Sequence, residues 1–268
     1  MTIVFAKPTI DIPRDRWSRP LITPADGGKP VPYTRMSTLA KALDDKTALT
    51  KWKMRQTIIG LAARPDLVQV AQTVKGDDRK LDEIAETAMV AAESERATNL
   101  GTALHSLSEQ VDAGADIDTL PEWARADMAA YKAALAGIEI LAAEMFVVVD
   151  EIEAAGTFDR LVRLPDGRVV VADLKTGRHE PRYPQGVTQQ IAGYSRGHLY
   201  DPEKGRVGHL PSLGIDQSVG LLIHAPAGTG TCDLYLLDLN VGWDLVRVSL
   251  AVRQTFKRKV ITPYEVTA

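Results

Sequence analysis

Two aspartates and a lysine flank a tight turn in the stretch Ala154–Gly177, AAGTFDRLVRLPDGRVVVADLKTG. Apolar residues recur on both sides of this turn as they do in strands, so the stretch is predicted to be a β-hairpin. The Pro-Asp-Gly turn at residues 165–167 suits a three-residue loop, with Pro at the first corner of a type I turn and Gly in the left-handed bulge position. The register set by that loop places Asp159 directly opposite Asp173.

Opposed carboxylates on a hairpin repel each other, because their Cβ atoms lie roughly 5 Å apart. Side chains alternate between the faces of a strand, so Lys175 is expected to share the face of Asp159 and Asp173. The repulsion can be removed by a shared proton or by a bound cation. A hard divalent ion with oxygen ligands, Mg²⁺ or Mn²⁺, is the favoured explanation. An exposed hairpin with solvated side chains is the alternative, and a two-residue Asp-Gly turn would separate the carboxylates.

Two predicted helices carry further polar side chains that could reach this hairpin. His105 flanks an apolar stripe, and Gly101, one turn earlier, leaves room for another chain segment to approach. Gln190 and Tyr194 are four residues apart and therefore point the same way. Taken alone, His105 is more simply a surface or packing residue, and the Gln-Tyr pair a partly polar helix face.

The composition of the 268-residue chain excludes several classes of protein. It has a net charge of −3 and a pI near 6.0, so any nucleic-acid-binding surface must be local. A single cysteine, Cys232, excludes an internal disulfide and an iron–sulfur cluster held by several cysteines. The chain has no P-loop, which argues against use of ATP. No apolar run is long enough to cross a membrane and no signal peptide is recognised, so a soluble, cytoplasmic protein is expected.

Hydrophobic periodicity divides the chain into three stretches. Residues 1–35 are rich in proline and expected to be an irregular arm, 36–140 form a helical region that carries the His motif, and 141–268 form a core of sheet and helices. Residues 36–268 are expected to be one compact domain of mixed α/β (α+β) class. Helices are expected over 37–45, 47–63, 78–112, 121–137, 185–200 and 240–259, and strands over 144–151, 154–164, 168–176, 218–225 and 231–239.

A basic cluster with one aromatic residue lies near the start of the second expected helix. Its members are Lys51, Trp52, Lys53 and Arg55. The cluster could contact a phosphate backbone, but an amphipathic helix with Trp52 in the core is the preferred interpretation.

Four short motifs follow one another between Gly101 and Tyr194, in the order G-x-x-x-H, G-T-F-D-R-L, D-L-K-T-G and Q-x-x-x-Y. This order resembles the RecB-type branch of the PD-(D/E)XK nuclease superfamily, which includes stand-alone phage-encoded exonucleases. The resemblance implies a restriction-endonuclease-like core, a mixed central sheet flanked by helices. The chain lacks the helicase of RecB itself and the four cysteines of the relatives with an iron–sulfur cluster.

The resemblance also implies roles for individual residues. One or two Mg²⁺ or Mn²⁺ ions would be held by His105, Asp159, Asp173 and the backbone carbonyl of Leu174. Lys175 would be catalytic together with the two aspartates, and Gln190 and Tyr194 would support the site and the path of the nucleic acid. Independently of the resemblance, Arg160, Arg178 and Arg182 lie near these residues in sequence and are expected phosphate contacts, with simple solvation of the three guanidinium groups as the alternative.

The predicted function is a metal-dependent DNA nuclease, an exonuclease acting in recombination, repair or replication. Its substrate would be single- or double-stranded DNA ends, with a recombination or replication protein as a partner and no membrane. If the chain is phage-encoded, the compartment would be the cytoplasm of the bacterial host. The alternative is a catalytically inactive nucleic-acid-binding or assembly module on the same fold.

Overall fold

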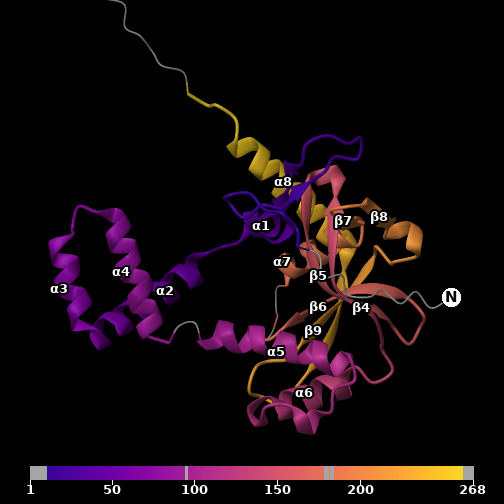
Figure 1. Cartoon of the computed structure of the whole chain (residues 1–268), viewed down its shortest axis with the longest axis horizontal. Coiled ribbons are helices and arrows are strands. Elements are labelled where there is room, and N and C mark those ends of the chain that lie inside the picture. Colours follow the sequence, from indigo (N-terminus) through magenta and orange to yellow (C-terminus); the bar gives the residue numbers. More distant parts are fainter. Residues whose placement is uncertain (1–10, 94–95, 178–180, 182–183, 262–268) are drawn as a thin grey trace, which may run out of the picture.

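A mixed eight-stranded sheet forms the centre of the molecule, and an N-terminal helical region precedes it (Figure 1). This computed structural model describes residues 11–93, 96–177, 181 and 184–261. The mixed α/β class predicted from the sequence is confirmed. Within the described residues no helix is both long and apolar enough to cross a membrane.

The sheet has the strand order β10-β9-β6-β5-β4-β7-β8, and β3 adds to it beside β5. β6 runs parallel to β9 and β3 parallel to β5, while the other neighbours are antiparallel. A separate pair, β1 and β2, lies in the N-terminal segment. The strands are β1 Leu21–Ile22, β2 Val31–Pro32, β3 Thr34–Arg35, β4 Glu139–Val149, β5 Ala154–Arg163, β6 Val169–Lys175, β7 His198–Asp201, β8 Gly205–His209, β9 Val219–His224 and β10 Asp233–Asp238.

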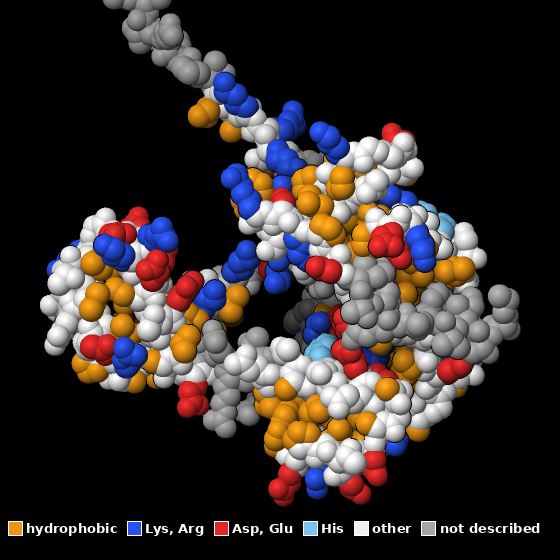
Figure 2. All heavy atoms as spheres, viewed as in Figure 1, with side chains coloured by type: hydrophobic (Ala, Val, Ile, Leu, Met, Phe, Trp, Pro, Cys, Tyr) orange, Lys and Arg blue, Asp and Glu red, His pale blue; other side chains and the backbone are white. Residues whose placement is uncertain are grey.

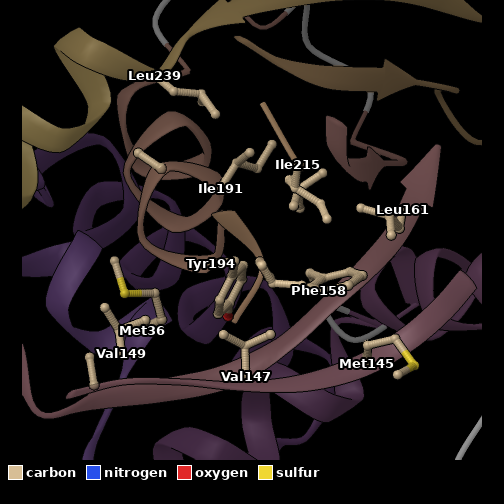
Figure 3. Close-up of a cluster of buried hydrophobic side chains, with 14 of the residues drawn as sticks. Met36, Met145, Val147, Val149, Phe158, Leu161, Ile191, Tyr194, Ile215 and Leu239 are labelled. Atoms are coloured by element: carbon tan, nitrogen blue, oxygen red, sulfur yellow. The ribbon is translucent and has the colours of Figure 1, made fainter. Parts of the chain in front are cut away.

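One face of the sheet is covered by α1 (Met36–Ala40), α7 (Gln185–Tyr194) and α8 (Leu239–Phe256). Their apolar side chains pack on alternate residues of β4, β5 and β6 and form the largest buried cluster in the described residues. Figure 3 shows Met36, Ile191 and Tyr194 of this cluster beside the strand residues Phe158 and Val147. α7 is therefore held firmly over the strands that carry the two aspartates.

The opposite face is covered by α5 (Arg96–Asp112) and α6 (Glu122–Ala134), which bury a second apolar cluster against β5, β6 and β9. Farther along the same face, the N-terminal segment packs on β4, β5 and β7 through Ile12, Ile22 and Tyr33. α5 carries His105, so the packing of its apolar stripe decides which strands the histidine can reach.

A helical arm of α2 (Thr47–Ala63), α3 (Pro65–Thr73) and α4 (Asp78–Ala91) stands to one side of the body (Figure 1). α2 and α4 cross closely at Gly60, where an added Cβ would lie 1.7 Å from the carbonyl oxygen of Ala88. The expectation that α2 is amphipathic with Trp52 in the core is wrong. The residue of α2 that is buried is Gly60, whereas Trp52 is only half-buried.

Other expected elements differ from the structure at their boundaries. The helix expected over 78–112 is two helices, because the chain turns at Glu93, which has a left-handed φ of 53°. The helix expected over 185–200 ends at Tyr194, and β7 begins at His198. Gly197 crosses β4 so closely that an added Cβ would lie 2.3 Å from Val147, which lets the chain pair with β4 at once. α3, β8 and the short strands before residue 36 were not expected.

Candidate metal centre at the end of the β5–β6 hairpin

The turn between β5 and β6 has the predicted geometry. Leu164 donates its amide hydrogen to the carbonyl oxygen of Arg168 at 2.8 Å, and Gly167 has a left-handed φ of 90°. The ladder pairs Arg163 with Val169 and continues to Arg160 and Ala172. The predicted register is confirmed over these residues, so the three-residue loop rather than a two-residue turn closes the hairpin.

The pairing of the two strands ends at Arg160 and Ala172, so the predicted next pair, Asp159 with Asp173, is not formed. In a continuing antiparallel ladder the amide of Leu174 would donate to the carbonyl of Phe158. It donates instead to Oδ2 of Asp159, at 2.8 Å. The expectation of a regular opposed pair is therefore corrected, because the Asp159 carboxylate takes the place of the next backbone acceptor. Its position between the strands is fixed by that hydrogen bond.

Asp173 lies on the α7 side of β6 and is only 7% exposed. Burial raises the pKa of its carboxyl group to about 6; Lys175 opposes this rise and Asp159 adds to it. Its Oδ2 accepts no hydrogen bond from the residues that the structure describes, although the Nζ atom of Lys175 lies 2.5 Å away. Lys175 and Asp173 thus form an ion pair, and because a carboxylate oxygen has two lone pairs this buried oxygen can accept a further partner.

His105 reaches the same place from α5, across the strands from α7. Its Nδ1 lies 3.7 Å from Oδ2 of Asp159. Burial lowers the pKa of the imidazole, while Asp159 and a hydrogen bond to the backbone of Leu174 favour the charged form. Gly101 permits the approach as predicted, since a Cβ there would lie 2.7 Å from the hydroxyl of Thr176. Helix α5 can therefore lie directly against the end of β6.

Glu144 is a third carboxylate at this site, and the sequence reasoning did not select it. It lies between the paired residues Ala143 and Met145, which places it across from Asp159 in the β4–β5 ladder. Its φ of 53° is unusual for a residue other than glycine inside a strand. Such backbone strain persists where surrounding structure holds it, and it is common at functional sites. The available signal was a single charged residue in the otherwise apolar stretch EILAAEMFVVV.

Tyr194 lies in the core beneath the carboxylates, and its ring packs at a tilt against Phe158 with centroids 6.4 Å apart. Burial raises the pKa of its hydroxyl, and nearby negative charges add to the rise. Those charges are on Asp173, Asp159 and Glu144. Gly156 leaves space for the phenol, because a Cβ there would lie 2.5 Å from the hydroxyl oxygen. Tyr194 is thus placed to hold α7 on the site.

Gln190, one turn before Tyr194, is half-buried. Its side-chain amide donates to the carbonyl of Gly186 on its own helix at 3.3 Å. The structure thus brings Tyr194 close to the two aspartates, while the described hydrogen bond of Gln190 stays within α7.

The expected phosphate contact at Arg160 is wrong. Arg160 is 1% exposed and points to the α5–α6 side, where Nε donates to Asp112 at 2.7 Å and Nη2 donates to Ser108 at 2.6 Å. Tyr131 donates to the same Asp112 carboxylate at 2.8 Å. A guanidinium enclosed in this way holds α5 and α6 on β5 and cannot meet a phosphate.

The other two expected phosphate contacts, Arg178 and Arg182, lie outside the described residues.

β9 supports the segment that follows Lys175. The amide of Ala225 donates to the carbonyl of Lys175 at 2.9 Å, and a ring nitrogen of the buried His224 lies 2.8 Å from the carbonyl oxygen of Gly177. His224 was not predicted, because a lone histidine at the end of an apolar strand gives no sign of a partner 47 residues away. The backbone of Lys175 and of the residues just after it is therefore held by hydrogen bonds to the end of β9.

The donor set suits a hard divalent cation. Carboxylate and carbonyl oxygens are ligands for Mg²⁺ and Mn²⁺, and an imidazole nitrogen is accepted more readily by Mn²⁺. The acceptor capacity left on the buried Oδ2 of Asp173 supports the fit. Among the described residues, however, no three His, Cys, Asp or Glu side chains are arranged to hold an ion as they stand. The ammonium of Lys175 lies beside the Asp173 carboxylate, where a metal ion would also bind.

A cavity of about 930 Å³ lies elsewhere, between α4, α5, α6 and the loop after β9. From α5 it is lined by Asn99, Leu100 and Ala103. At 100° per residue these three are on the opposite side of the helix from His105, so the cavity is separate from the carboxylates.

Comparisons of the sequence with known proteins found no relative: no protein-family model matches the chain, and no curated protein matches it.

Proposed function

We propose that this chain is a metal-dependent DNA nuclease that acts as an exonuclease in recombination, repair or replication. One observation carries the proposal: elements far apart in the sequence bring an imidazole, one buried and one partly exposed carboxylate, and a lysine to the end of one hairpin. His105 comes from α5, Asp159 from β5, and Asp173 with Lys175 from β6. The two neighbouring carboxylates carry more negative charge than the single ammonium of Lys175 offsets, so the pKa of Asp173 stays raised, and a bound cation would relieve that excess.

His105, Asp159, Asp173 and the carbonyl of Leu174 would hold one or two Mg²⁺ or Mn²⁺ ions. A bound ion of this kind polarises a phosphoryl oxygen and acidifies a water ligand. The hydrogen bond from the Leu174 amide keeps the Asp159 carboxylate between the strands, ready to ligate. Glu144, across from Asp159, adds negative charge that favours a cation at this place.

In this proposal Lys175 is a catalytic residue but does not bind the metal ion. Its ammonium lies beside Asp173, and the Lys175 side chain as a whole is 42% exposed, so a substrate could approach it next to the carboxylates. There it would stabilise negative charge on a phosphate oxygen or orient the attacking water. Tyr194 and Gln190 act through α7, whose packing under β5 and β6 keeps the carboxylates in place.

The substrate and the mode of cleavage rest on the resemblance of the four ordered motifs to RecB-type PD-(D/E)XK exonucleases. The finer fold assignment, a restriction-endonuclease-like core, rests on the same resemblance. It is supported by the antiparallel β4–β5–β6 unit followed by α7 and by β9 parallel to β6.

The direct test is digestion of end-labelled single- and double-stranded DNA with Mg²⁺, Mn²⁺ or EDTA. We expect progressive loss of the end label with either ion and none in EDTA. Asp173→Asn should abolish cleavage, while Asp244→Asn, an exposed carboxylate on α8, should not change it. Cleavage that persists in EDTA or in Asp173→Asn would remove the proposal.

A second candidate, an inactive nucleic-acid-binding or assembly module, is favoured by the ion pair of Lys175 with Asp173 and by the absence of a ready cluster of three ligands in the described residues. Calorimetric titration with Mn²⁺ separates the two, because a module without a metal site should give no heat that depends on Asp173.

A further inference from the structure

All the charged side chains of α2 are positive. Its sequence, TALTKWKMRQTIIGLAA, contains Lys51, Lys53 and Arg55 and no acidic residue, in a chain whose net charge is −3. All three cationic side chains are exposed. α3 has one acidic residue, Asp66, and no basic one, whereas α4 mixes basic and acidic residues, and its Arg79 and Glu83 form an ion pair.

The first half of α2 is not needed for the core. Its close contact with α4 is at Gly60, near its C-terminal end, and Gly60 is its buried residue. Leu49 and Met54 are 51% and 61% exposed. Exposed cations and exposed apolar side chains within the same two turns of a helix indicate a surface that contacts a partner molecule.

The position of α2 relates this surface to the carboxylates. Figure 2 shows an opening between the arm and the body, with Lys and Arg atoms gathered where α2 leaves the body. Histidine and acidic atoms line the other side of the opening, near α5. A strand that reached the carboxylates from this side would pass along α2.

We propose that the α2 basic segment, defined as Lys51, Trp52, Lys53 and Arg55, binds the phosphate backbone of DNA and leads it to the β5–β6 hairpin. The inference rests on the proposed function and adds a substrate-binding surface to it. Asp159, Asp173 and Glu144 repel a polyanion, so most of the binding free energy must come from cations away from the cleavage site. Trp52 is only half-buried, so part of its surface is accessible for contact with a base or sugar.

A membrane surface fits this helix less well. A helix that lies on a membrane separates a charged face from an apolar face. In α2 the charged and apolar residues are distributed around the helix: at 100° per residue, Lys53 lies on the opposite side from Lys51 and Arg55. Polyanion binding requires only that the cations be exposed near the path of the phosphates.

The experiment compares two triple variants of the full chain with the same change of net charge. One is Lys51→Gln, Lys53→Gln and Arg55→Gln; the control is Lys75→Gln, Arg79→Gln and Lys80→Gln on the far part of the arm, where all three residues are also exposed. Binding of a labelled DNA duplex and of a single strand is measured by fluorescence anisotropy in EDTA across a salt series, and melting temperatures show that both variants fold.

We expect the α2 variant to bind at least about tenfold more weakly near 0.1 M salt, with a log–log salt dependence shallower by about 2, because Lys53 lies on the other side of α2 from Lys51 and Arg55, and the control to bind like wild type. Equal weakening in the two variants, or no DNA binding by the wild type, would overturn the inference. Metal-dependent hydrolysis of bis(p-nitrophenyl) phosphate, too small to span the opening, tests the nuclease chemistry separately. It should be the same in both variants, so failure of the α2 segment and failure of the proposed function can be told apart.

Discussion

The backbone amide of Leu174 donates a hydrogen bond to Oδ2 of Asp159 at 2.8 Å, and at this point β5 and β6 cease to pair. The opening of the ladder places a carboxylate between two strands and leaves the carbonyl of Leu174 beside it. His105 approaches both groups from α5.

Asp173→Asn should raise the melting temperature of the metal-free protein. Burial and the neighbouring Asp159 disfavour the negative charge of Asp173 in the folded state, and the amide removes that charge at nearly constant volume. Thermal unfolding at neutral pH in EDTA is the measurement, with Asp244→Asn as the control. A lower melting temperature for Asp173→Asn would show that its ion pair with Lys175 outweighs the cost of burial.

Lys175→Ala should reduce turnover by orders of magnitude and leave binding of metal and DNA largely intact. The Lys175 side chain is partly exposed beside Asp173, but it would not be a metal ligand itself. Single-turnover cleavage gives the rate, and titration calorimetry with Mn²⁺ gives the metal affinity. Lys204→Ala, an exposed lysine before β8, is the control. Loss of Mn²⁺ binding in Lys175→Ala would assign the lysine a structural role.

His105→Ala should raise the half-saturating concentration of Mn²⁺ more than that of Mg²⁺, since an imidazole is the better ligand for Mn²⁺. His105→Asp should shift the preference back towards Mg²⁺. Activity against the concentration of each ion measures both effects, and His209→Ala on β8, at the far edge of the sheet, serves as the control. An unchanged ratio of the two half-saturation values would remove His105 from the metal site.

Arg160→Met should lower the free energy of unfolding by about 3–5 kcal/mol, because it leaves the carboxylate of Asp112 without its main cationic partner in the interior. Arg163, on β5 like Arg160, forms an ion pair with Glu139 of β4, and Arg163→Met breaks it, but both side chains of that pair are exposed. Its cost should stay below about 1 kcal/mol. Urea unfolding of the two variants checks the contrast, and equal losses would contradict the burial argument.

Asp150→Asn should destabilise the protein at neutral pH and have a smaller effect in acid. Hydrogen bonds from Arg206 lower the pKa of this carboxyl group, and Tyr33 donates to it as well. A pKa lowered by folding adds stability above the unfolded value near 4, and that stability is lost as the pH falls through the folded value. Urea unfolding of wild type and variant at pH 7 and at pH 3 measures the difference, which should shrink at pH 3.

Local sequence chemistry determined the hairpin and most of the elements. The Pro-Asp-Gly turn carried enough information for the register, because the loop type leaves one possible pairing. The bounds of α2 were predicted to the residue, from Thr47 to Ala63. The prediction that Gly101 admits another segment was equally local, since only the missing side chain was needed.

Tertiary structure alone decided which polar groups meet. Arg160 looks like a phosphate contact in sequence, but its partner Asp112 lies 48 residues away and closes over it. Glu144 joins the carboxylates because β4 pairs with β5 in one register, and α2 is left exposed because α4 meets it only near one end. The hydrophobic periodicity of a segment indicates whether it forms a helix or a strand and which of its faces is apolar. Which surface covers that face, and which charges it encloses, depends on contacts between segments that the sequence does not place beside each other.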